Sequence, residues 1–83
     1  MQKGFNSDIS INGLLYHVQT EDWGFQNPYI VTHVFQSGAV IKRIKSSYEE
    51  LLPKEALKDP QKIQLAMKTQ HEVILNLIQK EKP

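Results

Sequence analysis

The chain has 83 residues, ten Lys and Arg against nine Asp and Glu, and no cysteine. This length predicts a single small domain, residues 1–83, whose core needs good packing or an associated chain for stability. The near-neutral charge argues against nucleic acid as a partner, and the lack of cysteine excludes disulfides and thiolate metal ligands. No signal sequence and no apolar run of ~20 residues is present, so we expect a cytoplasmic location and no membrane contact.

The first half of the sequence predicts four β-strands. Residues 8–11 and 14–21 read as a hairpin, because the Asn12-Gly13 pair between them supplies the positive φ angles of a type I′ turn. Residues 29–36 are rich in β-branched and aromatic side chains, as in a central strand. After a turn at 36–38, residues 39–45 form the fourth strand, whose basic side chains suit a sheet edge.

Two helices are predicted after the strands. Ser47 precedes Glu50 by three residues, which is the spacing of a capping box, and a short helix over 48–52 should stop at Pro53. Asp59 and Pro60 mark the start of a second helix, which runs over 60–80 without glycine or proline. Its apolar residues occupy more than one side, so we expect two contact surfaces on this helix.

The elements assemble into an α+β fold, a four-stranded antiparallel β-meander with one long C-terminal helix packed on one face, in two layers. Strand alternation predicts apolar side chains on both faces of the sheet, with Tyr16 and Val18 on one and Leu15 and Phe35 on the other. One helix covers only one face, so the surplus apolar surface predicts a protein partner, most simply a second copy. The candidate interface residues are Trp23, Phe25, Phe35, Leu65 and Leu75.

Polar residues of the second and third strands, together with two helix residues, form a candidate site. We expect them to converge on one region between sheet and helix, where imidazoles and a carboxylate suffice for a zinc site. Their spacing matches no established metal motif, so a structural network of hydrogen-bonded side chains is the competing interpretation. This candidate polar cluster comprises His17, Gln19, Glu21, His33, Gln70 and His71.

Two further features carry weaker signals. Glu21 and Asp22 are adjacent on a strand and point to opposite sides, so they make a poor acid–base pair. Asp22 is better interpreted as a cap of the following loop, with Trp23 and Phe25 as a hydrophobic lid or a partner anchor. The basic run Lys42, Arg43 and Lys45 is interpreted as a solvated edge strand, because the chain lacks the net positive charge of a nucleic-acid binder.

Four segments resemble a small bacterial domain family of unknown function: HVQTED at 17–22, NPYIVTHVF at 27–35, SGAVIKRIKSSYEELL at 37–52 and MKTQHEVILNLI at 67–78. The resemblance implies no activity, ligand or fold. It implies that a set of polar residues belongs together, and Trp23 departs from the small polar residue of that pattern. The set is His17, Gln19, Glu21, Asp22, Thr32, His33, Tyr48, Gln70 and His71.

These observations favour a non-catalytic protein-interaction module that forms a homodimer or binds another protein. No phosphate loop, nucleophile elbow or cysteine nucleophile is present, so we expect neither an enzyme nor a cofactor. The alternative is a metal- or small-ligand-binding domain, possibly hydrolytic, that uses the candidate polar cluster. The ligand-binding hypothesis predicts thermal stabilisation by zinc, nickel or a small ligand that is lost in His33→Ala, whereas the interaction module predicts a stable oligomer without metal dependence.

Overall fold

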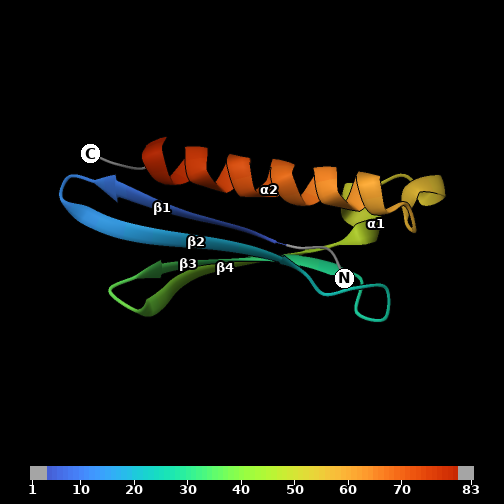
Figure 1. Cartoon of the computed structure of the whole chain (residues 1–83), viewed down its shortest axis with the longest axis horizontal. Helices are drawn as coiled ribbons and strands as arrows, with labels where there is room; N and C mark the ends of the chain where they lie inside the picture. The colour runs from blue at the N-terminus through green and yellow to red at the C-terminus, as the bar shows by residue number, and fades with distance from the viewer. Residues whose placement is uncertain (1–3, 81–83) are drawn as a thin grey trace.

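The computed structural model describes residues 4–80, which form one sheet and the helices beside it (Figure 1). The strands are β1 Phe5–Ile11, β2 Leu14–Asp22, β3 Tyr29–Gln36 and β4 Ala39–Ser47. They are followed by the short helix α1 Tyr48–Leu51, the 3-10 turn η1 Lys54–Ala56 and the long helix α2 Pro60–Lys80. The predicted α+β fold with a four-stranded antiparallel sheet and one long C-terminal helix is confirmed.

The sheet is a simple meander in the order β1-β2-β3-β4, so β1 and β4 are its edges. β1 begins at Phe5, three residues before the predicted start, because Phe5 and Asn6 still pair with Thr20 and Gln19. β4 continues to Ser47 and carries an irregularity in its pairing with β3 beside Val34 and Phe35. The turn η1 was not predicted from the sequence.

Both tight turns use positive φ angles, as the sequence predicts at Asn12-Gly13. The φ angles there are 51° and 81°. Ser37 and Gly38 repeat the pattern between β3 and β4, with φ angles of 53° and 81°. Two-residue turns of this kind match the twist of the strands they join, so they favour antiparallel pairing next to each turn.

The predicted helix starts are present. The Ser47 backbone N–H donates to Glu50 Oε1 at 2.7 Å, and the Glu50 N–H donates to Ser47 Oγ at 3.1 Å, which completes the capping box. These bonds from Ser47 lower the pKa of the Glu50 carboxyl. At α2 the Gln61 N–H donates to Asp59 Oδ1 at 3.0 Å. The helix therefore starts where Asp59 satisfies one of its first N–H groups.

The loop between β2 and β3 is held to α1 by a buried carboxylate. Asp22 Oδ1 accepts the Gly24 N–H at 2.9 Å, as predicted for a loop cap, and it also accepts the Tyr48 hydroxyl. The Tyr48 N–H in turn donates to the Pro28 carbonyl at 2.8 Å. Burial, and secondarily the bond to Asp22 and its negative charge, raise the pKa of Tyr48. Tyr48 thus stays neutral and available as a donor.

Helix α2 lies along one face of the sheet, mainly against β2, then β1 and β3 (Figure 1). Two apolar clusters fill the space between them. One contains Ile30, Tyr48, Ile63 and Met67, and the other contains Val18, Val34 and Ile74. Among residues 4–80, no helix has the length and apolar character needed to cross a membrane.

Candidate functional site

A chain of five polar side chains, four of them buried and Ser7 half-buried, crosses the core at the level between the two apolar clusters. Thr20 and Thr32 are paired across β2 and β3, and their Oγ1 atoms lie 2.7 Å apart. The His71 ring on α2 bonds to Thr20 Oγ1 through Nδ1 at 2.7 Å and to Ser7 Oγ through Nε2 at 2.8 Å. At the other end, Gln70 Nε2 donates to Thr32 Oγ1 at 3.0 Å. We call these five residues the buried polar chain.

The donors in this chain can be assigned by counting hydrogens. Thr32 Oγ1 already accepts from Gln70, so its own hydrogen is free to go to Thr20. Thr20 then donates its hydrogen to His71 Nδ1, and the neutral imidazole donates from Nε2 to Ser7. The reverse direction would leave the buried Thr32 hydroxyl without an acceptor, which is the more costly arrangement. We therefore assign the Nε2–H tautomer to His71.

The same accounting explains why His71 resists protonation. Burial among apolar groups lowers the pKa of His71, the nearby Glu72 carboxylate opposes this effect, and His17 adds to it. A protonated ring would donate from both nitrogens and turn Thr20 back toward Thr32, which would leave the Thr32 hydrogen without an acceptor. Desolvation and hydrogen bonding therefore both favour the neutral ring.

Thr20, Thr32 and His71 of the buried polar chain are closed to ligands because they are buried, whereas Gln70, 9% exposed, also lines a groove beside α2. Its bonds connect three strands to α2, so they specify how the helix sits on the sheet. Sequence reasoning did not include Ser7 or Thr20 in the candidate cluster. Thr20 alternates with Val18 on the inward face of β2, and this period-two position was the signal available for it.

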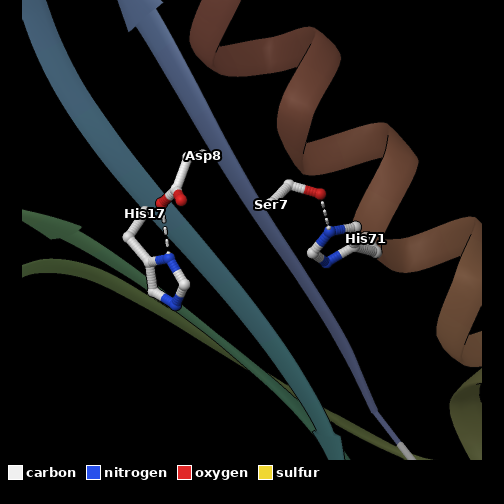
Figure 2. Close-up of polar contacts among 4 residues, drawn as sticks. All are labelled: Ser7, Asp8, His17 and His71. Atoms are coloured by element: carbon white, nitrogen blue, oxygen red, sulfur yellow. Dashed lines mark hydrogen bonds and ion pairs between the residues drawn. The ribbon is translucent and has the colours of Figure 1, made fainter.

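The prediction that six polar residues converge between sheet and helix is wrong. Gln70 and His71 lie there, whereas Gln19 pairs with His33, and His17 pairs with Phe35, on the opposite face of the sheet. Figure 2 shows the division: Ser7 and Asp8 are neighbours in β1 and point to opposite sides, one toward His71 and the other toward His17. The reason is strand alternation, which sends residues 17, 19, 21 and 33 to the face that α2 does not cover.

On that far face the two histidines flank Phe35 instead of meeting. The ring centroids of His17 and His33 lie 5.9 and 6.0 Å from that of Phe35. Glu21 accepts a hydrogen bond from Gln19 Nε2 at 3.3 Å. Within the described part of the chain, no group of three or more His, Cys, Asp or Glu side chains is placed to hold a metal ion.

Among the residues that the structure describes, His17 is the imidazole with a carboxylate hydrogen-bond partner. Its Nδ1 lies 2.7 Å from Asp8 Oδ1, and it lines a shallow hollow of about 390 Å³ at the tips of the two hairpins, beside Phe35 and Ser37. A carboxylate-oriented imidazole is suited to general base chemistry. Across residues 4–80, however, Asp8 is the hydrogen-bond partner of this ring, and the ring makes no hydrogen bond to a hydroxyl group of the kind that would activate a nucleophile.

The basic run of β4 does not form one patch. Lys42 pairs with Val34 on the helix side of the sheet, whereas Arg43 and Lys45 lie on the far face. Both of these cations lie over the Trp23 ring, with Arg43 Cζ 5.6 Å and Lys45 Nζ 5.1 Å from its centroid. Tyr29 meets the Trp23 edge with ring centroids 6.4 Å apart. Trp23 thus stacks against its own sheet.

The five candidate interface residues lie on separate surfaces. Trp23 and Phe35 are on the far face, and Phe25 is exposed in the loop with its ring edge against Tyr48. Leu75 packs against the core cluster around Ile74, so it is not an exposed anchor. Of the five candidate interface residues, Leu65 is the one that lines an apolar groove.

That surface is a groove of about 490 Å³ between α2 and β4, which we call the α2–β4 groove. Ile44 and Ser46 of β4 form its floor, and Leu51 and Leu52 close one end. Its α2 wall includes Leu65, Val73 and Leu77, with 58, 49 and 45% of their surface exposed. Lys62 is the one charged residue in the described lining. The second contact surface expected on the long helix stays a prediction, and this groove is the exposed apolar surface on α2 to which it would apply.

Comparison with known proteins adds nothing to this geometry: no family model, no curated protein and no solved structure matches the chain. The resemblance to a bacterial domain family remains a prediction. The function is therefore argued from the α2–β4 groove and from the closed nature of the buried polar chain.

Proposed function

We propose that the protein is a non-catalytic protein-interaction module that binds a helical segment of a polypeptide in the α2–β4 groove. The observation that supports this proposal is the gathering of exposed aliphatic side chains in one groove, with Leu65, Val73 and Leu77 at intervals of four or eight residues along α2. Contiguous apolar patches of this kind on small proteins mark interaction surfaces. The cytoplasmic location expected from the sequence belongs to the same proposal.

The shape and chemistry of the groove favour a helix over a small molecule. Residues 65 to 77 span roughly 18 Å along α2, which is the length of three turns of a docked helix. An amphipathic helix lays one apolar stripe into such a groove, and its polar side stays in water. Polar recognition groups, which would orient a small ligand, are few in the lining: Ser46, Lys62, Thr69 and Gln70.

The alternative, a metal- or ligand-binding domain, loses its main support because the six polar residues are divided between the two faces of the sheet. The Asp8–His17 pair is the remaining candidate for such chemistry, and it lies away from the α2–β4 groove. The interaction surface and this pair can therefore be tested separately.

The experiment is a selection of binders from a displayed library of amphipathic helical peptides, followed by affinity measurements on two protein variants. Val73→Lys places a charge inside the groove, whereas Leu15→Lys changes a side chain of similar size and exposure, 62%, outside its lining. We expect selected peptides to bind at least about 100-fold more weakly to Val73→Lys and equally well to Leu15→Lys. Recovery of no binder by a protein that is monomeric in solution, or of binders that respond only to Leu15→Lys, would contradict the proposal.

A further inference from the structure

We infer that the helix bound in the α2–β4 groove is α2 of a second copy of this chain, and that the two α2 helices lie parallel, each in the groove of the other. This inference rests on the proposed function and names the partner. It is argued from the space above the sheet, the self-complementarity of α2, the charges at the two ends of the groove and the area that would be buried.

The sheet has room for a second helix. Neighbouring strands are about 4.8 Å apart, so the outer strands of a four-stranded sheet are separated by roughly 14 Å. A helix with its side chains is about 10 Å in diameter, and β4 lies about 10 Å from β2, so a helix centred on β2 leaves space for a second helix over β4. Helix α2 packs mainly on β2, with β1 and β3 next (Figure 1). The groove is lined by Ile44 and Ser46 of β4, beyond the strands on which α2 packs.

The wall of the groove is itself a helix face of the kind that the groove would bind. Leu65, Val73 and Leu77 face the space beside α2, so a second α2 placed there brings the same three side chains against them. One contact then covers the exposed apolar stripes of both copies, because each copy uses the same patch. A helix of another protein would need an apolar stripe complementary to this wall, whereas α2 of a second copy already carries such a stripe.

The position of the sheets sets the orientation of the pair. If both sheets lay in one layer, the two β4 edges would meet between the helices and hold them apart. The helices can touch only when the sheets lie on opposite sides of the helix layer. The two-fold axis that relates the two copies then runs between the helices and parallel to them. Because this rotation keeps the direction of each helix, the two helices are parallel, and Val73 of one copy lies against Val73 of the other.

Charge also favours the parallel orientation. Lys62 lies at the end of the groove that Leu51 closes, and Glu49 and Glu50 immediately precede Leu51 in α1. A parallel second helix brings its Lys62 to this end, next to the first Lys62, where Glu49 and Glu50 of both copies offset the two positive charges. An antiparallel helix would bring Lys62 to the opposite end of β4, where Lys42 is the nearest charged residue of the strand on the helix side.

The area that this arrangement buries has the size of a small dimer interface. The part of α2 that lines the groove, Lys62 to Leu77, is about 22 Å long, so the footprint of a helix about 10 Å wide is roughly 220 Å². Each copy both receives one helix and contributes another, which gives roughly 440 Å² per copy. Stable interfaces bury about 800 Å² per partner, so the exchange of helices reaches about half of that area and predicts a dimer that dissociates on dilution.

The test is the molar mass in solution, measured by light scattering over a dilution series, for the wild type, Val73→Lys, Val73→Glu, an equal mixture of these two variants, and Leu15→Lys as the control. We expect a dimer for the wild type and for Leu15→Lys, and a dissociation constant at least about 100-fold higher for each Val73 variant alone, because like charges then meet at the axis. We expect the mixture to recover a dimer, since Lys and Glu at position 73 would face each other.

Three outcomes would overturn the inference: a wild-type protein that is monomeric at every concentration, a dimer whose dissociation constant is the same in the wild type and in both Val73 variants, or a mixture of the two variants that stays monomeric. Peptide binding in the groove by a monomeric protein would refute the second copy and leave the proposed function standing. The chain has no cysteine, so Val73→Cys introduces a single thiol and provides an independent test that adds no charge to the groove. Mild oxidation should form a disulfide between position 73 of two copies, and Leu15→Cys should form no such disulfide.

Discussion

Two histidines of this protein, His71 and His17, each bond to a side chain of β1, yet they behave as different kinds of residue. His71 is buried between sheet and helix with hydroxyl partners on both ring nitrogens. His17 lies on the far face, partly exposed, with a carboxylate on Nδ1. Figure 2 shows both bonds, one on each side of the β1–β2 hairpin.

The difference shows that the environment, and not the residue type, decides what a histidine does here. Their partners, Ser7 and Asp8, are consecutive in the sequence, and the strand sends them to opposite faces. A hydroxyl can support a neutral ring in a dry core, whereas a carboxylate pairs with a ring that water also reaches. We expect the buried contact to stabilise the fold and the exposed contact to add little.

The largest effect should come from removing the buried ring. His71→Ala leaves a cavity and deprives Thr20 and Ser7 of their partner, so we expect the free energy of unfolding to fall by about 3 kcal/mol. Urea denaturation followed by circular dichroism measures it, with His17→Ala as the matched control, for which we expect a loss below about 1 kcal/mol. Equal losses in the two variants would contradict the contrast drawn here.

The second effect is a dependence of stability on pH that arises from His71. Its pKa is lowered in the folded protein relative to 6.5, its ordinary value, so below pH 6.5 the unfolded chain binds more protons than the folded one. The free energy of unfolding should therefore be highest above about pH 6.5 and should fall as the pH drops toward the folded pKa. Below the folded pKa, His71 should contribute no further change.

NMR measures this directly, because the ring carbons of His71 report its protonation in the native protein and in urea. We expect the native midpoint to lie below the midpoint in urea. In Glu72→Gln the native midpoint should fall further, because the carboxylate that favours the charged ring is gone. A native midpoint at or above the value in urea would show that the ring is solvated or that it has a charged acceptor.

The smallest effect should come from the exposed pair. Asp8→Asn removes the charge beside His17 Nδ1 and should change the free energy of unfolding by no more than about 0.5 kcal/mol, because water screens an exposed ion pair. The same denaturation curves in low and high salt provide the check, since any contribution of this pair should shrink as salt increases. A loss of several kcal/mol that salt does not reduce would place Asp8 in a structural role.

Much of the fold could be predicted because its signals are local. The Asn12-Gly13 turn, the capping box at Ser47 and the Asp59-Pro60 helix start each depend on residues within four positions of one another. The early start of β1 escaped prediction because Phe5 and Asn6 are strand residues only through their pairing with β2. The turn η1 lacks a comparable local pattern and was missed.

The candidate site was predicted less well because it depends on which face each residue occupies. Gln70 and His71 were recognised as members of a polar network, and they are, but with Ser7, Thr20 and Thr32. Strand alternation indicated that His17 and Thr20 lie on opposite faces. It did not indicate which face α2 covers, since both faces carry apolar residues.

The sequence by itself determined the element order, the turns, the helix starts and the surplus of apolar residues on the long helix. These properties follow from backbone geometry and from hydrophobic periodicity, which act over a few residues. Only the tertiary structure decided that α2 lies on the Val18 and Ile30 side, that Thr20 receives His71, and that Leu65, Val73 and Leu77 open onto a groove beside β4. Those outcomes depend on the packing of segments some fifty residues apart, where the fit of side chains selects one of two similar sheet faces.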